Sequence, residues 1–397
     1  MTVLIATIGG QPAPIVHAIQ QTRPTHLAFL ASRAGVGTNT GSEDEIEGIL
    51  KAAGWSGPAP IIETTDRPDE LTAIWEACRL LAQRLPAATN VIANYTGGSK
   101  SMSAALVSYA LRAGWALQVQ SARRTDLVKI AASDRARQVA VGDIIAHDVR
   151  RQAAFLAQRH DHRGAAMLLE GLLAVHPLPR ELQDELQSDI AVHHFEDAVE
   201  SYDFETASGL LSARGGTLGK THGATWSPRL RAFAQTLAWL SSPSEVRPKH
   251  LRDATSLVDF LVDTAHRSAE RGRYDDAFSR LYRATELLAQ VVLRFAFDLR
   301  TGDLDRTRIP EDFARKLAER KDGKLYSGLM ESYALLTALA HPLGKHFDAK
   351  RDRLRSLLEN RNDSWLAHGF RSITPSLWRD YGEPWIQWLS DARTAAQ

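Results

Sequence analysis

Residues 90–113 read NVIANYTGGSKSMSAALVSYALRA. The segment 90–95 is short and largely apolar, as a buried strand is, and residues 100–113 have the apolar spacing of a helix. Two adjacent glycines between them permit the sharp turn that joins a strand to a helix. A strand that passes through a glycine turn into a helix is the repeating unit of a parallel sheet with helical crossovers.

The same alternation of strand and helix patterns extends over the first 147 residues. It predicts an α/β domain with a mainly parallel, Rossmann-like sheet that ends in an antiparallel hairpin. Strands are expected at residues 3–8, 26–31, 59–63, 90–95, 117–121 and 127–131, and helices at 14–21, 43–53, 69–85 and 100–113.

Strand patterns nearly disappear after residue 148, and the rest of the chain is predicted to be all-α. Residues 148–247 are expected to form a helical connecting domain, with a glycine-rich loop at 212–227 and a linker near Pro243 and Pro248. Residues 248–397 are expected to form a helical bundle. Its predicted helices span 251–271, 274–299, 311–320, 325–340, 351–358, 364–369 and 385–396.

Composition excludes several classes of protein. The chain has 397 residues, of which 44% are hydrophobic and 24% charged, as in folded proteins with more than one domain. The one cysteine, Cys78, cannot form an internal disulfide or a cysteine metal cluster. No apolar stretch reaches the ~18 residues of a membrane span, and Met1 leads directly into a strand pattern rather than a secretion signal. The chain is therefore expected to be cytoplasmic, and without a recognition helix or basic stripe it is not expected to bind DNA.

Two glycine segments follow predicted strands, at residues 6–12 and 94–102. At the carboxyl edge of a parallel sheet, such loops present backbone amides and a helix N-terminus, both of which favour phosphate. Neither segment has the spacing of a P-loop or of a dinucleotide fingerprint. Each alone could simply be a tight turn, but the pair, with Thr96, Ser99 and Lys100 as donors, favours a phosphate-bearing ligand.

Residues 361–368, Arg-Asn-Asp-Ser-Trp-Leu-Ala-His, place a permanent cation seven positions before an imidazole. An arginine can bind a phosphate and a histidine can move a proton at neutral pH. Within one straight helix the two would lie about 10.5 Å apart along the axis, too far to act on one phosphate. Asn362, Asp363 and Ser364 favour helix N-termini, so a break and a new helix from Trp365 are predicted. The alternative is that His368 packs at a helix end, with Gly369 as its cap, while Arg361 is a solvated charge.

These segments together resemble a known family. ATIGGQPAPI (6–15) and NYTGGSKSMSAAL (94–106) are similar to the ligand loops of CARF domains, which are Rossmann-like sensors of cyclic oligoadenylates in type III CRISPR systems. Residues 361–368 resemble the R-x4-6-H motif of HEPN ribonucleases. RYDDAFSRLYRATE (273–286) is similar to a helix of CRISPR-associated CARF–HEPN proteins.

The resemblance implies a homodimeric, cyclic oligoadenylate-activated, metal-independent endoribonuclease that cleaves single-stranded RNA to 2′,3′-cyclic phosphate ends. It implies no metal and no cofactor besides a cyclic tetra- or hexa-adenylate activator. Arg361 and His368 would be catalytic, with Asn362 orienting either group. The expected activator-binding residues are Thr7, Gly9, Gly10, Gln11, Ser32, Arg33, Thr96, Gly97, Gly98, Ser99 and Lys100.

Two alternatives remain open at this point. The protein could be a nucleotide-sensing regulator or scaffold that cuts nothing, or its CARF domain could degrade its own activator, with Thr7 or Thr96 positioning a 2′-hydroxyl.

Several other polar and aromatic residues carry weaker expectations. Tyr282 and Glu286 either brace the bundle or orient Arg361, and His341 and His346, in an expected loop, either are structural or line the RNA cleft. Three tryptophans are expected in core or dimer packing rather than as platforms for RNA bases: Trp378, Trp385 and Trp388.

Overall fold

The computed structural model describes residues 1–33, 41–87, 90–121, 124–125, 128–129, 135–139, 141–176, 178–213, 217–241, 250–317 and 324–396. These residues form two compact units. The first comprises Met1–Arg150 with Gly171–Gln183, and the second comprises Arg151–Glu170 with Asp184–Gln397. The helices expected in a separate connecting domain are thus shared between the two units, and the boundaries at residues 147 and 247 stay predictions.

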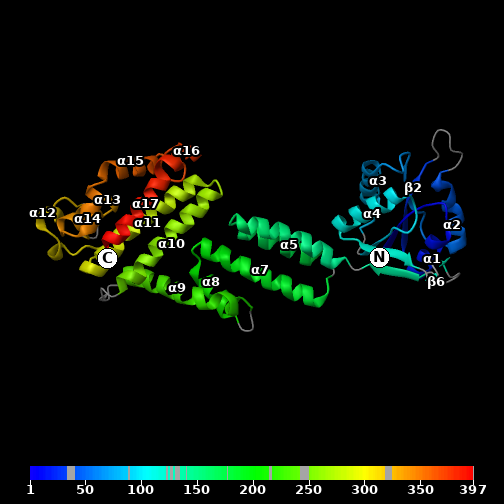
Figure 1. The fold of residues 1–397 in the computed structure, drawn as a ribbon, viewed down its shortest axis with the longest axis horizontal. Coiled ribbons are helices and arrows are strands. Elements are labelled where there is room, and N and C mark those ends of the chain that lie inside the picture. Colours follow the sequence, from blue (N-terminus) through cyan, green and yellow to red (C-terminus); the bar gives the residue numbers. More distant parts are fainter. Residues whose placement is uncertain are drawn as a thin grey trace. The chain divides into compact units, whose positions relative to one another are not determined.

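A six-stranded sheet forms the centre of the first unit (Figure 1). Its strand order is β3-β2-β1-β4-β5-β8. The first five of these strands are parallel, and β8 pairs antiparallel with β5. The predicted mainly parallel sheet is therefore confirmed, whereas its antiparallel edge strand is β8, where the sequence predicted no strand. The strands are β1 (Thr2–Thr7), β2 (His26–Ser32), β3 (Ile61–Thr65), β4 (Asn90–Asn94), β5 (Ala116–Ser121) and β8 (Arg135–Val139).

A separate two-stranded hairpin precedes β8. It consists of β6 (Arg124–Thr125) and β7 (Val128–Lys129), which pair antiparallel. Only β7 tests the strand expected at 127–131, because residues 127, 130 and 131 lie outside the described residues.

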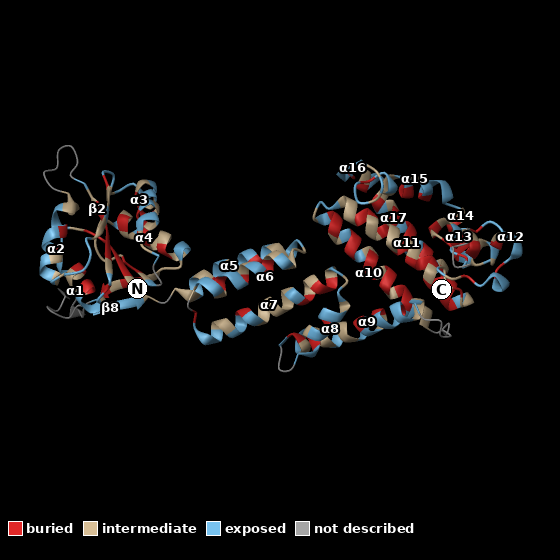
Figure 2. Ribbon diagram, turned by 180° about the vertical axis from the view of Figure 1, so that it is seen from behind, coloured by how far each residue is buried: buried red, intermediate tan, exposed pale blue. Residues whose placement is uncertain are grey.

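Helices cover both faces of the sheet because side chains alternate along its strands. On β1, Val3 and Ile5 point into the core shared with α3 and α4, whereas Leu4 and Ala6 point into the core shared with α1 and α2. Figure 2 shows the buried strands between these more exposed helices. The helices are α1 (Ala13–Thr22), α2 (Ile46–Ala53), which follows the short 3-10 helix η1 (Ser42–Glu45), α3 (Leu71–Arg84) and α4 (Lys100–Ala113).

The described chain from residue 142 onward is almost entirely helical, as predicted. No helix of the described residues has both the length and the apolar character needed to cross a membrane. The helices are α5 (Gly142–Gln158), α6 (His162–Val175), α7 (Arg180–Glu200), α8 (Phe204–Ser212), α9 (Thr217–Ser241), α10 (Leu251–Glu270), α11 (Tyr274–Phe297), η3 (Arg306–Arg308), α12 (Glu311–Ala314), α13 (Leu329–Ala338), α14 (Pro342–Asp348), α15 (Arg351–Asn362), α16 (Pro375–Leu377), η4 (Trp378–Gly382) and α17 (Glu383–Ala396).

Helix α11 is the centre of the second unit. Its apolar side chains are buried, and α10, α13, α15 and α17 pack around it. Two long-range bonds converge on Thr285 of α11: its hydroxyl accepts from Trp385 Nε1 at 2.8 Å, and its carbonyl accepts from Tyr333 Oη at 2.9 Å. Trp385, like Trp378 and Trp388, is buried, which confirms the expectation of core packing.

The loop expected at 212–227 is a helix from Thr217 onward. Helix α9 runs through Pro228, and residues 214–216 lie outside the described residues. Tertiary packing explains the error, because Leu218, Leu230 and Phe233 of α9 are buried in the core of the second unit. The glycines that suggested a loop are tolerated within a helix at a cost of about 1 kcal/mol each relative to alanine.

Candidate functional sites

The two glycine loops meet at one edge of the sheet, where the strand order changes direction. Chain order runs from β1 through β2 to β3 on one side, and continues with β4 and β5 on the other. Because β1 and β4 are neighbours, the loop after β1 (Gly9–Gly10) lies beside the loop after β4 (Gly97–Gly98). This switch point is where open parallel sheets bind ligands.

Close backbone packing between the loops requires glycine at three positions. A Cβ on Gly9 would stand 2.6 Å from the backbone nitrogen of Gly98, and one on Gly97 would overlap the carbonyl oxygen of Thr7. Gly98 has a φ of +80°, which side chains disfavour. Gly10 differs, because no described atom lies within 4 Å of the place where its Cβ would stand. The glycines therefore build the edge, and Gly10 is its open position.

The two threonines of the site point into the protein. Thr7 is fully buried and donates from its hydroxyl to the Gly97 carbonyl at 2.6 Å. The Thr96 hydroxyl accepts from the backbone nitrogen of Gln120 at 2.8 Å. Both side chains support the loop from within. Their expected ligand contacts stay predictions that this geometry does not favour.

Positive potential at the edge comes from the start of α4. Ser99 caps this helix by accepting from the Met102 amide at 3.1 Å, and its hydroxyl donates to the Pro68 carbonyl at 2.5 Å. The amides before Met102 lie in the first turn, where a helix offers no internal acceptor, so they can bind an anion. Gln11 and Lys100 are exposed. Backbone amides and these two side chains are what the edge offers to a phosphate.

The predicted contacts on β2 lie one strand further along the edge. Ser32 is tied to Ser42, with its backbone nitrogen donating to the Ser42 hydroxyl at 2.7 Å. Arg33 is exposed and donates from Nη2 to the Thr64 hydroxyl at 2.6 Å. Arg33, directly after β2, thus keeps a charge at the surface.

A buried amide network below the loops was not predicted. Asn94 donates from Nδ2 to Gln118 Oε1 at 2.8 Å, and its own Oδ1 accepts from the Thr96 amide at 3.1 Å. Gln120, two residues beyond Gln118, is buried, and within the described structure its side-chain amide has no partner. The sequence signal was available, since polar residues alternate with apolar ones along β5.

The Arg361–His368 segment folds back on the end of α15. Arg361 is in the last turn of this helix, which ends at Asn362 with Asp363 as its C-cap. The chain then turns, so that the His368 amide donates to the Asn362 carbonyl at 3.1 Å and the Arg371 amide to the Asp363 carbonyl at 2.8 Å. The turn brings the histidine backbone to the residue next to Arg361, instead of the 10.5 Å axial offset estimated for one straight helix.

This geometry corrects two expectations. The chain does break between Arg361 and His368, as predicted, but residues 364–369 form turns instead of a second helix. Helix α15 also continues to Asn362, past the predicted end at residue 358, so Arg361 is helical. Ser364 is no N-cap, because it is fully buried and its hydroxyl has no partner in the described structure. Gly369 is essential to the turn, since a Cβ there would overlap the backbone of Asp363.

Tyr282 of α11 positions Arg361. The guanidinium carbon lies 4.4 Å from the centre of the Tyr282 ring, a cation–π contact, and Nη1 donates to Asn362 Oδ1 at 3.2 Å. Burial, together with Glu286, raises the pKa of Tyr282 although Arg361 opposes this, so the phenol is neutral. Glu286 itself pairs with Arg283 at 3.0 Å. Of the two residues expected to brace the bundle or orient Arg361, Tyr282 contacts the arginine directly.

Exposed apolar side chains surround the pair. Asn362 and His368 are exposed, and the same turn exposes 60% of Trp365, 61% of Leu366 and 81% of Phe370. The Trp365 and Phe370 rings contact edge to face, with centres 5.3 Å apart. Large apolar side chains gathered at one place mark an interaction surface. An accessible cation and imidazole thus lie within a surface suited to a partner.

The two further histidines have structural contacts. His341 caps α14, with Nδ1 accepting from the Leu343 amide at 3.2 Å, and burial lowers its pKa. His346 lies in the same helix and stacks on Trp388, with ring centres 5.8 Å apart. The loop expected around Pro342 is therefore a short helix.

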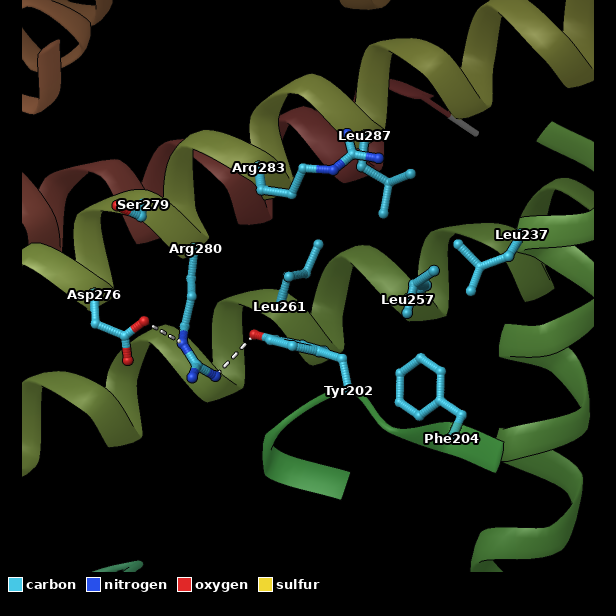
Figure 3. A pocket seen from close by; sticks show the side chains of 10 residues that line it. All are labelled: Tyr202, Phe204, Leu237, Leu257, Leu261, Asp276, Ser279, Arg280, Arg283 and Leu287. Carbon is cyan, nitrogen blue, oxygen red and sulfur yellow. Dashed lines mark hydrogen bonds and ion pairs between the residues drawn. The ribbon is translucent and has the colours of Figure 1, made fainter. Parts of the chain in front are cut away.

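The segment 273–286 joins α11 to the helices before it. Arg280 donates to the Tyr202 hydroxyl at 2.8 Å and to Asp276 Oδ1 at 3.2 Å. Figure 3 shows Arg280 reaching from α11 to Tyr202 at one side of a largely apolar cavity of about 330 Å³. Because Arg280 is largely buried, these bonds satisfy a charge that would otherwise destabilise the fold.

The first unit thus carries a glycine-built sheet edge, and the helical bundle of the second unit carries an arginine–histidine turn. Residues 247–383 match the family model described as the Csm6 HEPN domain. The chain also shares the fold of Enterococcus italicus Csm6 bound to cyclic hexa-2′-fluoro-hexa-dAMP. That match has a TM-score of 0.62 and 12% identity, and it covers 100% of this chain and 92% of that one.

Other comparisons add little. Can2 from Sulfobacillus thermosulfidooxidans in complex with cyclic tetra-adenylate matches with a TM-score of 0.27 and 13% identity, over 54% of this chain and 69% of that one, which is too low to establish a common fold. No curated protein sequence matches the chain.

Proposed function

We propose that the protein is a cyclic oligoadenylate-activated endoribonuclease of type III CRISPR defence, acting in the cytoplasm. The observation that carries this proposal is the turn after α15, which brings the backbone of the exposed His368 to Asn362, the residue after Arg361, in a region similar to the Csm6 HEPN domain. The similarity to a Csm6 crystallised with a cyclic oligonucleotide supports the same reading for the Rossmann-like sensor domain.

The reaction we propose is attack of a ribose 2′-hydroxyl on the adjacent phosphorus. The new P–O2′ bond forms as the P–O5′ bond breaks, which leaves a 2′,3′-cyclic phosphate and a 5′-hydroxyl. His368 accepts the 2′-hydroxyl proton or delivers a proton to the leaving 5′-oxygen, and Arg361 stabilises the charge on the phosphoryl oxygens. Asn362 helps to orient the guanidinium through its side-chain oxygen. The nucleophile and the proton-transfer group are both organic, so the reaction is expected to need no metal ion.

A homodimer is part of this proposal. Trp365, Leu366 and Phe370 are exposed around the pair, and a second copy would cover them and bring a second Arg361–His368 pair to the cleft. The activator would place its phosphates at the Gly10 amide and at the start of α4, near Gln11 and Lys100. Binding must favour the active arrangement over the inactive one for the sensor to regulate cleavage.

The direct test uses a quenched fluorescent RNA in EDTA, with cyclic tri-, tetra- or hexa-adenylate added separately. We expect one ring size to activate cleavage and a DNA strand of the same sequence to remain intact. If no ring size activated cleavage, the proposal would be contradicted. Cleavage that EDTA abolishes would contradict its metal-independent chemistry.

Tyr282→Leu should slow activated cleavage by roughly 3- to 30-fold, because it removes the ring face under Arg361. Tyr282→Phe, which keeps that face, should stay within about twofold of the parent rate. Initial rates at saturating activator measure both variants. Equal rates for the leucine and phenylalanine variants would show that the stacking does not position Arg361.

A further inference from the structure

A cavity of about 180 Å³ lies between α14, α15 and α17, and nothing described so far uses it. Its lining includes His346 of α14, Lys350 and Arg353 at the start of α15, and Gln387 and Trp388 of α17. It also includes Asp391, whose Oδ1 accepts from Gln387 Nε2 at 3.1 Å. The lining therefore combines two cationic residues, a histidine and a tryptophan with one carboxylate.

Two ring nitrogens in the lining have no partner. Trp388 is only 7% exposed, and neither its Nε1 nor Nε2 of His346 meets a hydrogen-bond partner in the described structure, although both atoms are buried. An indole N–H can only donate. A buried donor left unsatisfied costs about 1–3 kcal/mol, so this position calls for an acceptor.

The N-terminus of α15 adds positive potential to the same cavity. Its N-cap is Lys350, which forms no side-chain capping bond within the described structure. The first bond of this 12-residue helix is from Leu354 to the Lys350 carbonyl at 3.0 Å, so the amides of residues 351–353 have no acceptor inside the helix. Lys350 and Arg353 form no ion pair among the described residues. The N-terminus of α15, the cations Lys350 and Arg353 and the unpaired indole N–H all favour the binding of an anion.

The size of the cavity limits the ligand. Pockets for whole small molecules measure about 300–1,000 Å³, so about 180 Å³ holds a phosphate with part of its sugar or base. A phosphodiester of a longer strand fits this description better than a free nucleotide, because the remainder of the strand can stay outside.

The cavity and Arg361 lie on one side of α15. Leu354 lines the cavity, and Arg361 follows it by seven residues, which is nearly two full turns and returns to the same face. Arg353 and Arg361 are eight residues apart, or about 12 Å along the axis. A few nucleotides of an extended strand cover this distance.

We propose that this cavity is a phosphate subsite that holds the RNA substrate a few nucleotides from the bond that is cut. The proposal rests on the proposed ribonuclease function. Lys350, Arg353 and the α15 amides contact the phosphate oxygens, and Trp388 Nε1 donates to an oxygen of the same nucleotide.

Binding of a 2′-O-methyl RNA, which 2′-hydroxyl chemistry cannot cut, tests the subsite without relying on cleavage. Fluorescence anisotropy of such an RNA should show at least a tenfold loss of affinity for Lys350→Ala/Arg353→Ala. The slope of log affinity against log salt should become shallower by about 0.7 for each RNA phosphate that the variant no longer neutralises. The matched control is Lys345→Ala/Arg355→Ala, which removes two cations of α14 and α15 outside the cavity lining and should change affinity by less than threefold.

Trp388→Phe separates a ligand contact from a structural role. It removes the unpaired N–H and keeps an aromatic ring, so thermal stability should hold while RNA affinity falls severalfold. Loss of stability with unchanged affinity would overturn the proposal, as would equal affinities for the cavity and control double variants. Inorganic phosphate that stabilises the parent but not the cavity variant, with RNA affinity unaffected, would show a site for a free anion and likewise refute an RNA subsite. A parent that binds RNA through the cavity but cuts none with any activator would refute the ribonuclease instead.

Discussion

His368→Ala should abolish activated RNA cleavage, lowering the rate by at least ~100-fold, because it removes the imidazole that we propose moves the proton. The matched control is His266→Ala, which removes another exposed histidine of the same domain, one that contacts Glu270 at 3.4 Å on the surface of α10. That variant should cleave at the parent rate. Initial rates with the activating ring at saturation measure both.

Activator binding makes the His368→Ala result interpretable. The variant should bind the cyclic activator with unchanged affinity, since the substitution leaves the sheet edge intact. Cleavage at the parent rate by His368→Ala would exclude the proposed chemistry and leave a regulator or scaffold as the better description. Loss of cleavage together with loss of activator affinity would instead point to a misfolded protein.

Gly97→Ala should impair the sensor domain more than any other single methyl group added at the sheet edge. The new Cβ would overlap the carbonyl oxygen of Thr7, which is a backbone atom and cannot move away as a flexible side chain could. Overpacking of this kind costs about 1–3 kcal/mol, so we expect a lower unfolding temperature and a roughly tenfold or larger loss of activator affinity. Calorimetry and isothermal titration measure these effects.

Gly10→Ala is the matched control for that variant. Its added methyl group meets no described atom within 4 Å, and the residue has no positive φ to strain, so thermal stability should be that of the parent. If Gly97→Ala were as stable as Gly10→Ala, the two loops would not pack against each other as described.

The sequence predicts the five parallel strands of the sheet because each follows a local pattern, whereas the edge strand β8 was not predicted. Apolar runs of four to eight residues followed by glycine turns place both ligand loops at the correct edge. The inward direction of the Thr7 side chain cannot be predicted from such a local pattern. It depends on the β1–β4 pairing, which sets the hydroxyl against a carbonyl 90 residues away. No local pattern contains that information.

Residues 364–369 show the same limit at the second site. Their composition permits a helix start, and only the bonds from His368 to Asn362 and from Arg371 to Asp363 decide for a turn. These bonds require Gly369 to lie against the backbone of Asp363, a close approach that spacing cannot reveal. The pairing of Arg361 with Tyr282 could be anticipated as an alternative, since both residues were candidates, but only the packing of α15 on α11 brings them together.

Helix α11 connects two contacts, one made by Arg280 and one made by Tyr282. The two residues are separated by two positions, about 3 Å along the axis, and so face nearly opposite sides of the helix. Arg280 is anchored to Tyr202, whereas Tyr282 lies under Arg361. Because an α-helix is stiff along its axis, a displacement of Tyr202 would be passed through α11 to the Tyr282 ring and to the Arg361 guanidinium that lies on it.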